Sequence, residues 1–454
     1  MTEAELLEAL EAALRVSDGE VELSAQAGRQ GTTRFAGSRV TQTGDVEDVT
    51  VQARVRQGAS VGAARTNALD ADSIARTIAQ ARAQAQAQAS VAGAQSGTGF
   101  PGFADGGAAA TAVPSSFDEA TAVADASARA ALVEPAFRAA TRAGLSAAGL
   151  AVLTDSTLAV ATRAGCRRSF RSTAARLDVI AADGNASARA SRCATAIANL
   201  PAAEVAAEAC EGALRGRDPI ELPPGAYDVI LEPAAVAEVL EWLALTSFGA
   251  RAIEEGSSCL AGRLGQRITG PITIYDDALS GDGGCPTLPF DAEGTPTRKV
   301  SFLSGGVAGG PVYDRASAAR AGVEPTGHSP PLADDLFDGG AVPTHLHIAP
   351  GPDDTDALLA RVERGLWVTR FHYVNGLLDT RRALMTGMTR DGLHLIENGK
   401  RTRPVRNLRW TESVLDAFTR LAGTTRTRQL IAAGLSDSVF VCPTLLLRAW
   451  TFTG

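Results

Sequence analysis

The sequence lacks the features that would place the chain in a membrane, in a disulfide-rich scaffold or on nucleic acid. No apolar run approaches the roughly 20 residues of a membrane span, and the acidic, amphipathic start MTEAELLEALEAALRVSDGE is unlike a signal peptide. The six cysteines form no CxxC pair, so reduced thiols in a cytoplasmic protein are the simplest interpretation. The net charge of −8 offers no surplus of Lys and Arg for phosphates. We therefore expect neither a membrane nor nucleic acid among the partners.

Aromatic residues are also scarce. They make up 5% of the 454 residues, whereas apolar residues as a whole make up 45% and charged residues 21%. This balance is typical of folded chains and excludes global disorder. The core must then be built mainly from Ala, Val, Leu and Ile, which bury less area each than aromatic side chains do. The length suggests two to four domains.

The succession of helical and strand patterns indicates an α+β fold. N-terminal and middle α/β sections precede a β-rich C-terminal section whose strands are mostly antiparallel. We predict domains at 1–110, 111–222 and 223–454. The first boundary falls in a connection rich in Gly, Ser and Pro, and paired prolines open the last section.

Four stretches carry helical periodicity. A leucine stripe predicts a helix over 3–15, and similar patterns predict helices near 202–215 and 233–247. A longer helix is predicted from about Phe117 to Arg142.

Turn signals divide the strand patterns. A turn is predicted at Asp155–Ser156, and Asn398–Gly399 between two strand patterns predicts a β-hairpin. Ser304 lies among glycines in FLSGGVAGG, and a Gly-rich hairpin explains it without catalysis, because no G-x-S-x-G elbow or P-loop is present. Asp291 and Glu293, in PFDAEGTPTRKVSFLSGG, are interpreted as a charged turn before a strand.

Two of the five histidines lie two residues apart in PTHLHIAPG. In a strand, His345 and His347 project from one face, which is compatible with metal binding. A catalytic metal site needs at least a third ligand, and His328, His372 and His394 lie in separate segments without an HExxH pattern. We therefore favour two strand histidines on a polar face, bordering a groove, over a metal site.

Several segments, in order along the chain, resemble the TldD/PmbA family, also called TldD/TldE. The first is TTRFAGSRVTQTGDVEDVTVQARVRQGASVGAARTNALDADSI, which is similar to the family's first domain. Others are similar to its third domain: PFDAEGTPTRKVSFLSGG, GLWVTRFHYVN, MTGMTRDG, HLIENGK and the closing VCPTLLLRAWTFTG. The resemblance implies a subunit of a metallopeptidase.

In the TldD kind of subunit, an HExxxH helix and a cysteine near the C-terminus hold zinc. Here the corresponding helix contains Glu241 and Thr246 at the two ligand positions and Trp242 at the general-base position. A Thr hydroxyl is a poor zinc ligand, and Trp cannot accept a proton from bound water. Cys442 has apolar neighbours, so we interpret it as an inert buried thiol.

The resemblance therefore implies a PmbA/TldE-like subunit with no catalytic residue, metal or other cofactor of its own. Such a subunit pairs with a TldD-like HExxxH subunit, which is expected to carry the zinc, and helps to enclose a chamber that holds an extended peptide. Four polar residues are candidates for lining that chamber: His345, His347, His372 and Asn375.

Three alternatives remain open. The chain could belong to an N-deacylating complex in natural-product biosynthesis, or it could be a homodimeric protein that binds peptide by strand addition without hydrolysing it. The least favoured alternative is an independent enzyme that uses His345, His347 or Cys442.

Overall fold

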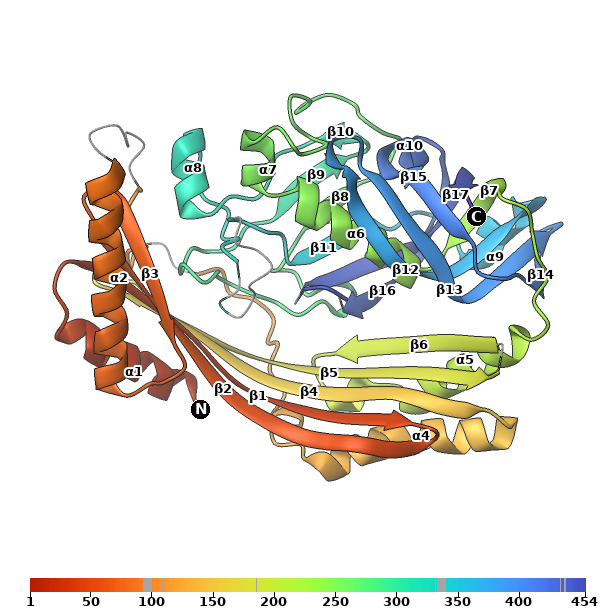
Figure 1. Cartoon of the computed structure of the whole chain (residues 1–454), viewed down its shortest axis with the longest axis horizontal. Coiled ribbons are helices and arrows are strands. Elements are labelled where there is room, and N and C mark those ends of the chain that lie inside the picture. The colour runs from red at the N-terminus through yellow and green to blue at the C-terminus, as the bar shows by residue number, and fades with distance from the viewer. Residues whose placement is uncertain are drawn as a thin grey trace.

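The structure is a computed structural model that describes residues 1–92, 100–107, 110–184, 186–330, 332, 340–432, 434–436 and 438–454, with backbone alone at 91 and 92. Two sheets with their covering helices form the molecule, and they lie one above the other in Figure 1. The predicted α+β class is confirmed. None of the helices in the described part of the chain is both long and apolar enough to cross a membrane.

The first sheet has six antiparallel strands in the order β3-β2-β1-β4-β5-β6. Their bounds are β1 Glu20–Ala36, β2 Arg39–Gln57, β3 Ser60–Thr66, β4 Ser146–Thr162, β5 Arg167–Asp183 and β6 Ala186–Ala194. Apolar residues alternate toward the core, and Leu23 of β1 lies opposite Ala53 of β2, both fully buried. The sheet takes strands from both predicted segments 1–110 and 111–222, and the boundary between them stays a prediction.

Helices cover the sheet at two places. The helices α1 Glu3–Arg15 and α2 Ala71–Ala92 pack at one end, whereas α4 Ala126–Ala143 and α5 Ala202–Arg215 lie beneath the other end in Figure 1. The predicted bounds of the first helix are confirmed, because Thr2 and Glu5 form a capping box at its start.

Two of the expectations for this half were wrong. The predicted turn at Asp155–Ser156 lies inside β4, where Asp155 accepts two hydrogen bonds from Arg171 of β5, at 2.8 and 2.7 Å. A cross-strand ion pair thus replaces the turn that the polar residues suggested. The long helix predicted from Phe117 is interrupted between α3 Glu119–Ala122 and α4, because Asp125 accepts bonds from two backbone N–H groups and caps the second helix.

The second sheet has eleven strands, and its path runs β10-β9-β8-β11-β17-β15-β13-β12-β7. β14 pairs with β13, and β16 with β17. The strand bounds are β7 Gly225–Leu231, β8 Ile274–Asp276, β9 Val300–Ser304, β10 Val307–Ala308, β11 His345–Ile348, β12 Arg364–Asp379, β13 Leu384–Glu397, β14 Lys400–Pro404, β15 Arg409–Ser413, β16 Leu421–Ala432 and β17 Val439–Phe452. β7 pairs with both β12 and β17, so this part of the sheet closes on itself. The predicted hairpin at Asn398–Gly399 is confirmed, with positive φ at both residues.

Four short helices and one long one accompany this sheet. They are α6 Pro233–Ser247, α7 Ala250–Glu254, α8 Arg315–Ala321, α9 Thr355–Ala360 and α10 Val414–Thr419. α6 packs against β12 and β17, and its apolar side chains belong to the largest core cluster.

The two sheets meet along β6. Gln429 of β16 donates a hydrogen bond to the carbonyl of Ser191, and Ser187 donates one to Asp391 of β13. These contacts place β5 and β6 opposite helix α6 and strand β16, which is where the candidate site lies (Figure 1).

Candidate functional site: helix α6 and the hollow beside it

Helix α6 is formed by residues that favour helices, with Pro233 at its first position and Ala, Val and Leu behind it. It presents two glutamates on one face, because Glu238 and Glu241 are three residues apart. Ala234 and Ala237 share that face, and their small side chains leave space in front of the helix.

Glu241, at the first ligand position, is fully engaged within the protein. Its carboxylate accepts hydrogen bonds from the backbone N–H groups of Gly434, Leu435 and Ser436, at 3.3, 2.9 and 3.1 Å, and from the hydroxyl of Ser436 at 3.1 Å. The side chain therefore anchors the segment between β16 and β17 to the helix. A carboxylate whose lone pairs are used in this way is a poor candidate for a metal ligand.

Trp242 and Thr246 are engaged as well. The Trp242 ring is half-buried and packs on Gly376 of β12, where an added Cβ would come within 2.9 Å of it. Thr246 Oγ1 donates a hydrogen bond of 2.7 Å to the carbonyl of Trp242, one turn back. Neither side chain can therefore act as a metal ligand or as a general base toward a water molecule.

Cys442 on β17 completes the comparison with a zinc site. It is fully buried, and burial raises the pKa of its thiol, which disfavours the thiolate that binds zinc. The predicted burial of Cys442 is confirmed, and its inertness stays a prediction. In the described ranges no three His, Cys, Asp or Glu side chains are grouped to hold a metal ion. This donor set does not fit zinc.

A hollow of about 100 Å³ opens in front of α6. Glu238 and Glu241 face it from the helix, Arg176 from β5, Arg189 from β6 and Arg370 from β12. Residues far apart in the sequence thus bring three guanidinium groups and two carboxyl groups around one small space.

The arginines are held by two aspartates at the rim of this hollow. Arg176 Nε donates to Asp178 at 2.6 Å, and Arg189 donates to the other oxygen of the same carboxylate. Arg370 Nε donates to Asp391 at 2.8 Å. A guanidinium has five N–H donors, so these bonds fix the three groups while leaving each with further donors.

Glu238 has no hydrogen-bond partner in the described part of the chain. Burial raises its pKa to about 7; the charge of Arg370 opposes the rise, and the charge of Glu241 adds to it. This carboxyl group therefore changes its protonation near neutral pH, inside a hollow lined by arginines. Perturbed carboxyl groups of this kind are typical of ligand-binding and catalytic sites.

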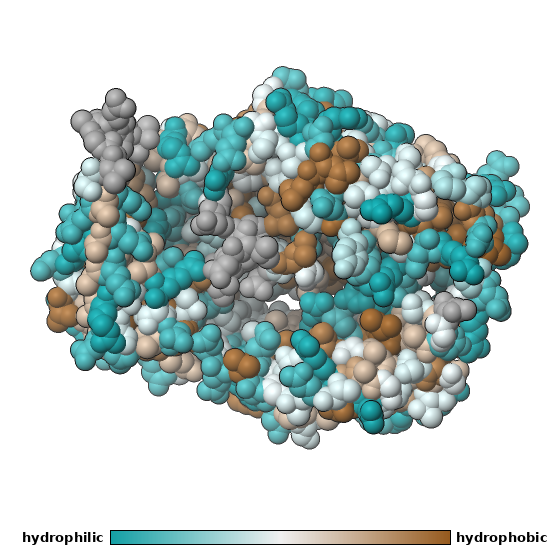
Figure 2. Space-filling view, in the orientation of Figure 1, coloured by the Kyte–Doolittle hydropathy of each residue, from teal (hydrophilic) through white to brown (hydrophobic). Residues whose placement is uncertain are grey.

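A larger groove continues from the hollow. It has a volume of about 390 Å³ and lies between the first sheet and the strands β16 and β17. Arg176 and Ala432 border both spaces, and Thr173 and Cys193 line the groove from the first sheet. Figure 2 shows the surface hollowed between the two halves of the molecule in this region.

The histidines do not meet in this groove. His345 and His347 lie on β11, as predicted for a strand, and both are buried. His347 stacks on Tyr275 with ring centroids 5.1 Å apart. The backbone N–H of His345 bonds to Asp276, whose carboxylate also lies 3.2 Å from His328 Nε2.

Burial accounts for the pKa of these rings. It lowers the pKa of His345 to about 4, although Asp276 opposes the fall, so this imidazole is neutral at physiological pH. His372 on β12 is half-buried and Asn375 is exposed. None of these four predicted chamber residues borders the hollow or the groove, and their role in a chamber stays a prediction.

The segment around Asp291 and Glu293 has a structural role that the sequence did not indicate. Arg54 of β2 donates hydrogen bonds to Glu22 at 3.0 Å and to Glu293 at 2.5 Å, and Ser24 donates one to the carbonyl of Ala292 at 2.6 Å. These side chains are nearly all buried. The predicted charged turn therefore joins the C-terminal half to the first sheet.

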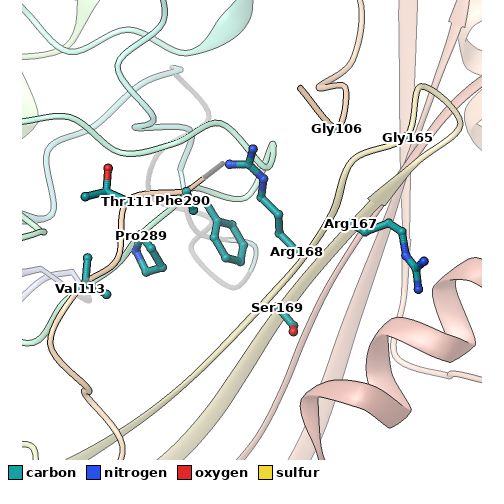
Figure 3. Close-up of a pocket in the computed structure, with 10 residues that line it drawn as sticks. Gly106, Thr111, Val113, Gly165, Arg167, Arg168, Ser169, Pro289 and Phe290 are labelled. Carbon is teal, nitrogen blue, oxygen red and sulfur yellow. The ribbon is translucent and has the colours of Figure 1, made fainter. Parts of the chain in front are cut away.

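A second hollow, of about 510 Å³, lies beside this junction. Figure 3 shows Phe290 and Pro289 on one side and strand β5 on the other. Arg168 extends toward Phe290, whereas Arg167 points to the opposite face, where it pairs with Glu11. Both residues border the hollow, but the alternation of the strand sends their side chains in opposite directions.

Comparison with known proteins agrees with this geometry. Residues 224–454 match the PmbA/TldA metallopeptidase C-terminal domain family. The chain belongs to the TldD/PmbA family. Its match to that family begins at β7 and covers the whole second sheet, including α6 and Cys442.

Two relatives are recognisably similar in sequence. A TldD metalloprotease homologue of Haemophilus influenzae is 28% identical over 153 residues, which are 33% of this chain and 30% of that protein. A metalloprotease of Methanothermobacter thermautotrophicus is 24% identical over 203 residues, 44% of this chain and 43% of that one. The chain thus aligns with less than half the length of these relatives.

The TldD/PmbA fold extends over the entire chain. TldE from Thermococcus kodakarensis superposes with a TM-score of 0.85 at 16% identity, covering 99% of this chain and 100% of that one. A protein of Thermotoga maritima described as a putative modulator of DNA gyrase gives 0.83 at 19% identity, with full coverage of both chains.

Proposed function

We propose that this chain is the non-catalytic, TldE/PmbA-like subunit of a TldD-type zinc metallopeptidase. The observation that carries the proposal is the state of helix α6. Glu241 is occupied by four hydrogen-bond donors, Trp242 is packed on Gly376, and Thr246 is bonded to its own helix. The zinc and the general base are then supplied by a TldD-like partner with an intact HExxxH helix.

The role left for this chain is to hold an unfolded or modified peptide beside the partner's zinc. The groove of about 390 Å³ supports this role, because it lies along two strands that have a partner on one side only in the described sheets. These strands are β6, paired with β5, and the end of β16 at Leu430 and Ala432, paired with β17; the other side of β16 is bridged to Asp353 at Thr425, which does not line the groove. An extended peptide can bind such an edge through backbone hydrogen bonds.

A cytoplasmic location is part of the proposal. All six cysteines are free thiols, and five of them are buried. Thiols that stay reduced are typical of proteins in a reducing compartment.

The test is to purify the chain alone and together with a TldD-like protein that carries HExxxH. We expect zinc at one equivalent per pair and cleavage of an unfolded peptide only in the mixture, with both lost when the partner's HExxxH glutamate is replaced by Gln. Zinc-dependent cleavage by the chain alone would contradict the proposal.

The same experiment separates the alternatives. Release of an acyl group from an N-acylated substrate, with no peptide cleavage, would identify an N-deacylating complex instead. A homodimer that never elutes with the TldD-like chain in size-exclusion chromatography would identify a peptide-binding protein without a hydrolytic partner.

A further inference from the structure

The hollow in front of α6 combines donors for an anion with a carboxyl group that can become neutral. Arg176, Arg189 and Arg370 each keep N–H donors beyond those bound to Asp178 and Asp391. Planar guanidinium groups bind carboxylates through paired N–H···O bonds, which Lys cannot reproduce. The space of about 100 Å³ admits a carboxylate end and a few further atoms, because one water takes up about 30 Å³.

The charges around the hollow cancel when Glu238 is protonated. The three arginines face the paired aspartates Asp178 and Asp391 and the carboxylate of Glu241, whose charge is not cancelled by the neutral donors that bond to it. Ionised Glu238 therefore leaves one negative charge in excess. An anionic ligand can take the place of that charge when Glu238 is neutral.

We propose that this hollow is a carboxylate-binding site in which Arg370 and Arg189 receive the ligand while Glu238 takes up one proton. A ligand carboxylate takes the place of the negative charge that Glu238 gives up, so the total charge of the hollow does not change. Two carboxylates in so small a space repel each other, so binding and protonation of Glu238 occur together.

The groove next to the hollow indicates where the rest of a ligand lies. Because Arg176 and Ala432 border both spaces, a peptide in the groove can place its C-terminal carboxylate in the hollow. This extension to a peptide rests on the proposed peptide-holding function. The binding of a carboxylate does not rest on it, and neither the partner nor zinc is needed to test it.

Isothermal titration calorimetry on the isolated chain tests the site. The probes are trialanine with a free carboxyl terminus, trialanine amide and acetate, at pH 6 and pH 8 in buffers of different ionisation enthalpy. We expect the amide to bind roughly tenfold or more weakly than the free acid. We expect binding of the acid to take up a proton and to weaken about tenfold from pH 6 to pH 8, because Glu238 titrates near 7.

Glu238→Gln is the decisive variant, since glutamine imitates the neutral form of the side chain. It should bind the free acid at both pH values without proton uptake, and Glu254→Gln on α7 serves as a surface control that keeps the pH dependence. Circular dichroism melts confirm that both variants fold.

Each outcome either supports the proposed carboxylate site or contradicts it. Acetate binding as tightly as trialanine would retain the carboxylate site and reject the peptide as its source. Equal affinity for acid and amide, no binding of any carboxylate at millimolar concentration, or an unchanged pH dependence in Glu238→Gln would overturn the assignment. None of these results bears on pairing with a TldD-like subunit.

Discussion

The carboxylate of Glu241 lies 2.9 Å from the backbone nitrogen of Leu435, and this hydrogen bond fastens helix α6 to the segment between β16 and β17. In the related zinc helix the same position is expected to bear a histidine ligand. Here the side chain is buried and bound to the backbone, so its contribution is to the stability of the site. This position therefore fixes a backbone segment that borders the hollow and the groove, and does not bind a metal.

Glu241→Ala should therefore destabilise the fold. It removes the acceptor of the backbone N–H groups of Leu435 and Ser436, which are partly exposed, so water replaces part of the lost bonding and the cost is about 1–2 kcal/mol of unfolding free energy. Urea denaturation measures the loss. Glu255→Ala, at an exposed position of an i,i+4 pair, is the matched control and should change stability by less than about 0.5 kcal/mol. Equal effects of the two substitutions would show that the Glu241 contacts are not stabilising.

Gly376→Ala should be destabilising because of the Trp242 ring. The added Cβ would come within 2.9 Å of Trp242 atoms, an overlap that costs about 1–3 kcal/mol. In a Trp242→Ala background the same substitution should cost at least about 1 kcal/mol less, since the two residues are in contact. Gly44→Ala, whose added Cβ meets no atom within 4 Å, is the control. Thermal denaturation of the four variants completes the cycle, and simple additivity would refute the packing assigned to Trp242.

The junction at Glu22 should make stability depend on pH. Burial raises the pKa of Glu22 to about 7, although Arg54 opposes the rise, and one carboxylate oxygen is buried without a partner in the described structure. The folded state therefore binds this proton more tightly than the unfolded state, whose pKa is near 4.5. The contribution is complete below pH 4.5 and is lost as the pH rises through 7.

We expect the unfolding free energy to fall by about 2–3 kcal/mol between pH 5 and pH 9 through this group. Glu22→Gln should reduce the fall over that window by this amount, and the remainder comes from groups such as Glu238 and Asp291, whose pKa values burial also raises to about 7. Glu20→Gln, more exposed at the start of the same strand, should leave the profile unchanged. Denaturant titrations at intervals of one pH unit provide the measurement. An equal fall in the wild type and in Glu22→Gln would show that Glu22 is ionised in the folded protein.

Local structure was predictable where neighbouring residues decide it. The helix over 3–15 has a leucine stripe and a capping box, and the hairpin at Asn398–Gly399 has residues that tolerate positive φ. The turn expected at Asp155–Ser156 failed for the opposite reason. Its polar residues resemble a turn until the partner strand is known, and Arg171 lies on that strand.

The candidate site was also predictable only in part. Resemblance placed Glu241, Trp242 and Thr246 on one helix, and that helix is present. The sequence also allowed Glu238 to be identified as a candidate site residue. It lies one turn before Glu241 on the same face of the helix, which it shares with two alanines. The buried state of His345 and His347 was not predictable, since alternation in a strand shows which side chains share a face and not what covers that face.

The sequence by itself determined that α6 contains no histidine, because side-chain type is a property of the sequence: where the resemblance leads us to expect two imidazoles and a base, the helix has a carboxylate, an indole and a hydroxyl. Only the tertiary structure decided which side chains face helix α6. Arg176, Arg189 and Arg370 reach the helix from β5, β6 and β12, across sequence separations of about 50 to 130 residues. Such a meeting depends on how two sheets pack on each other, and no local pattern in the chain encodes it.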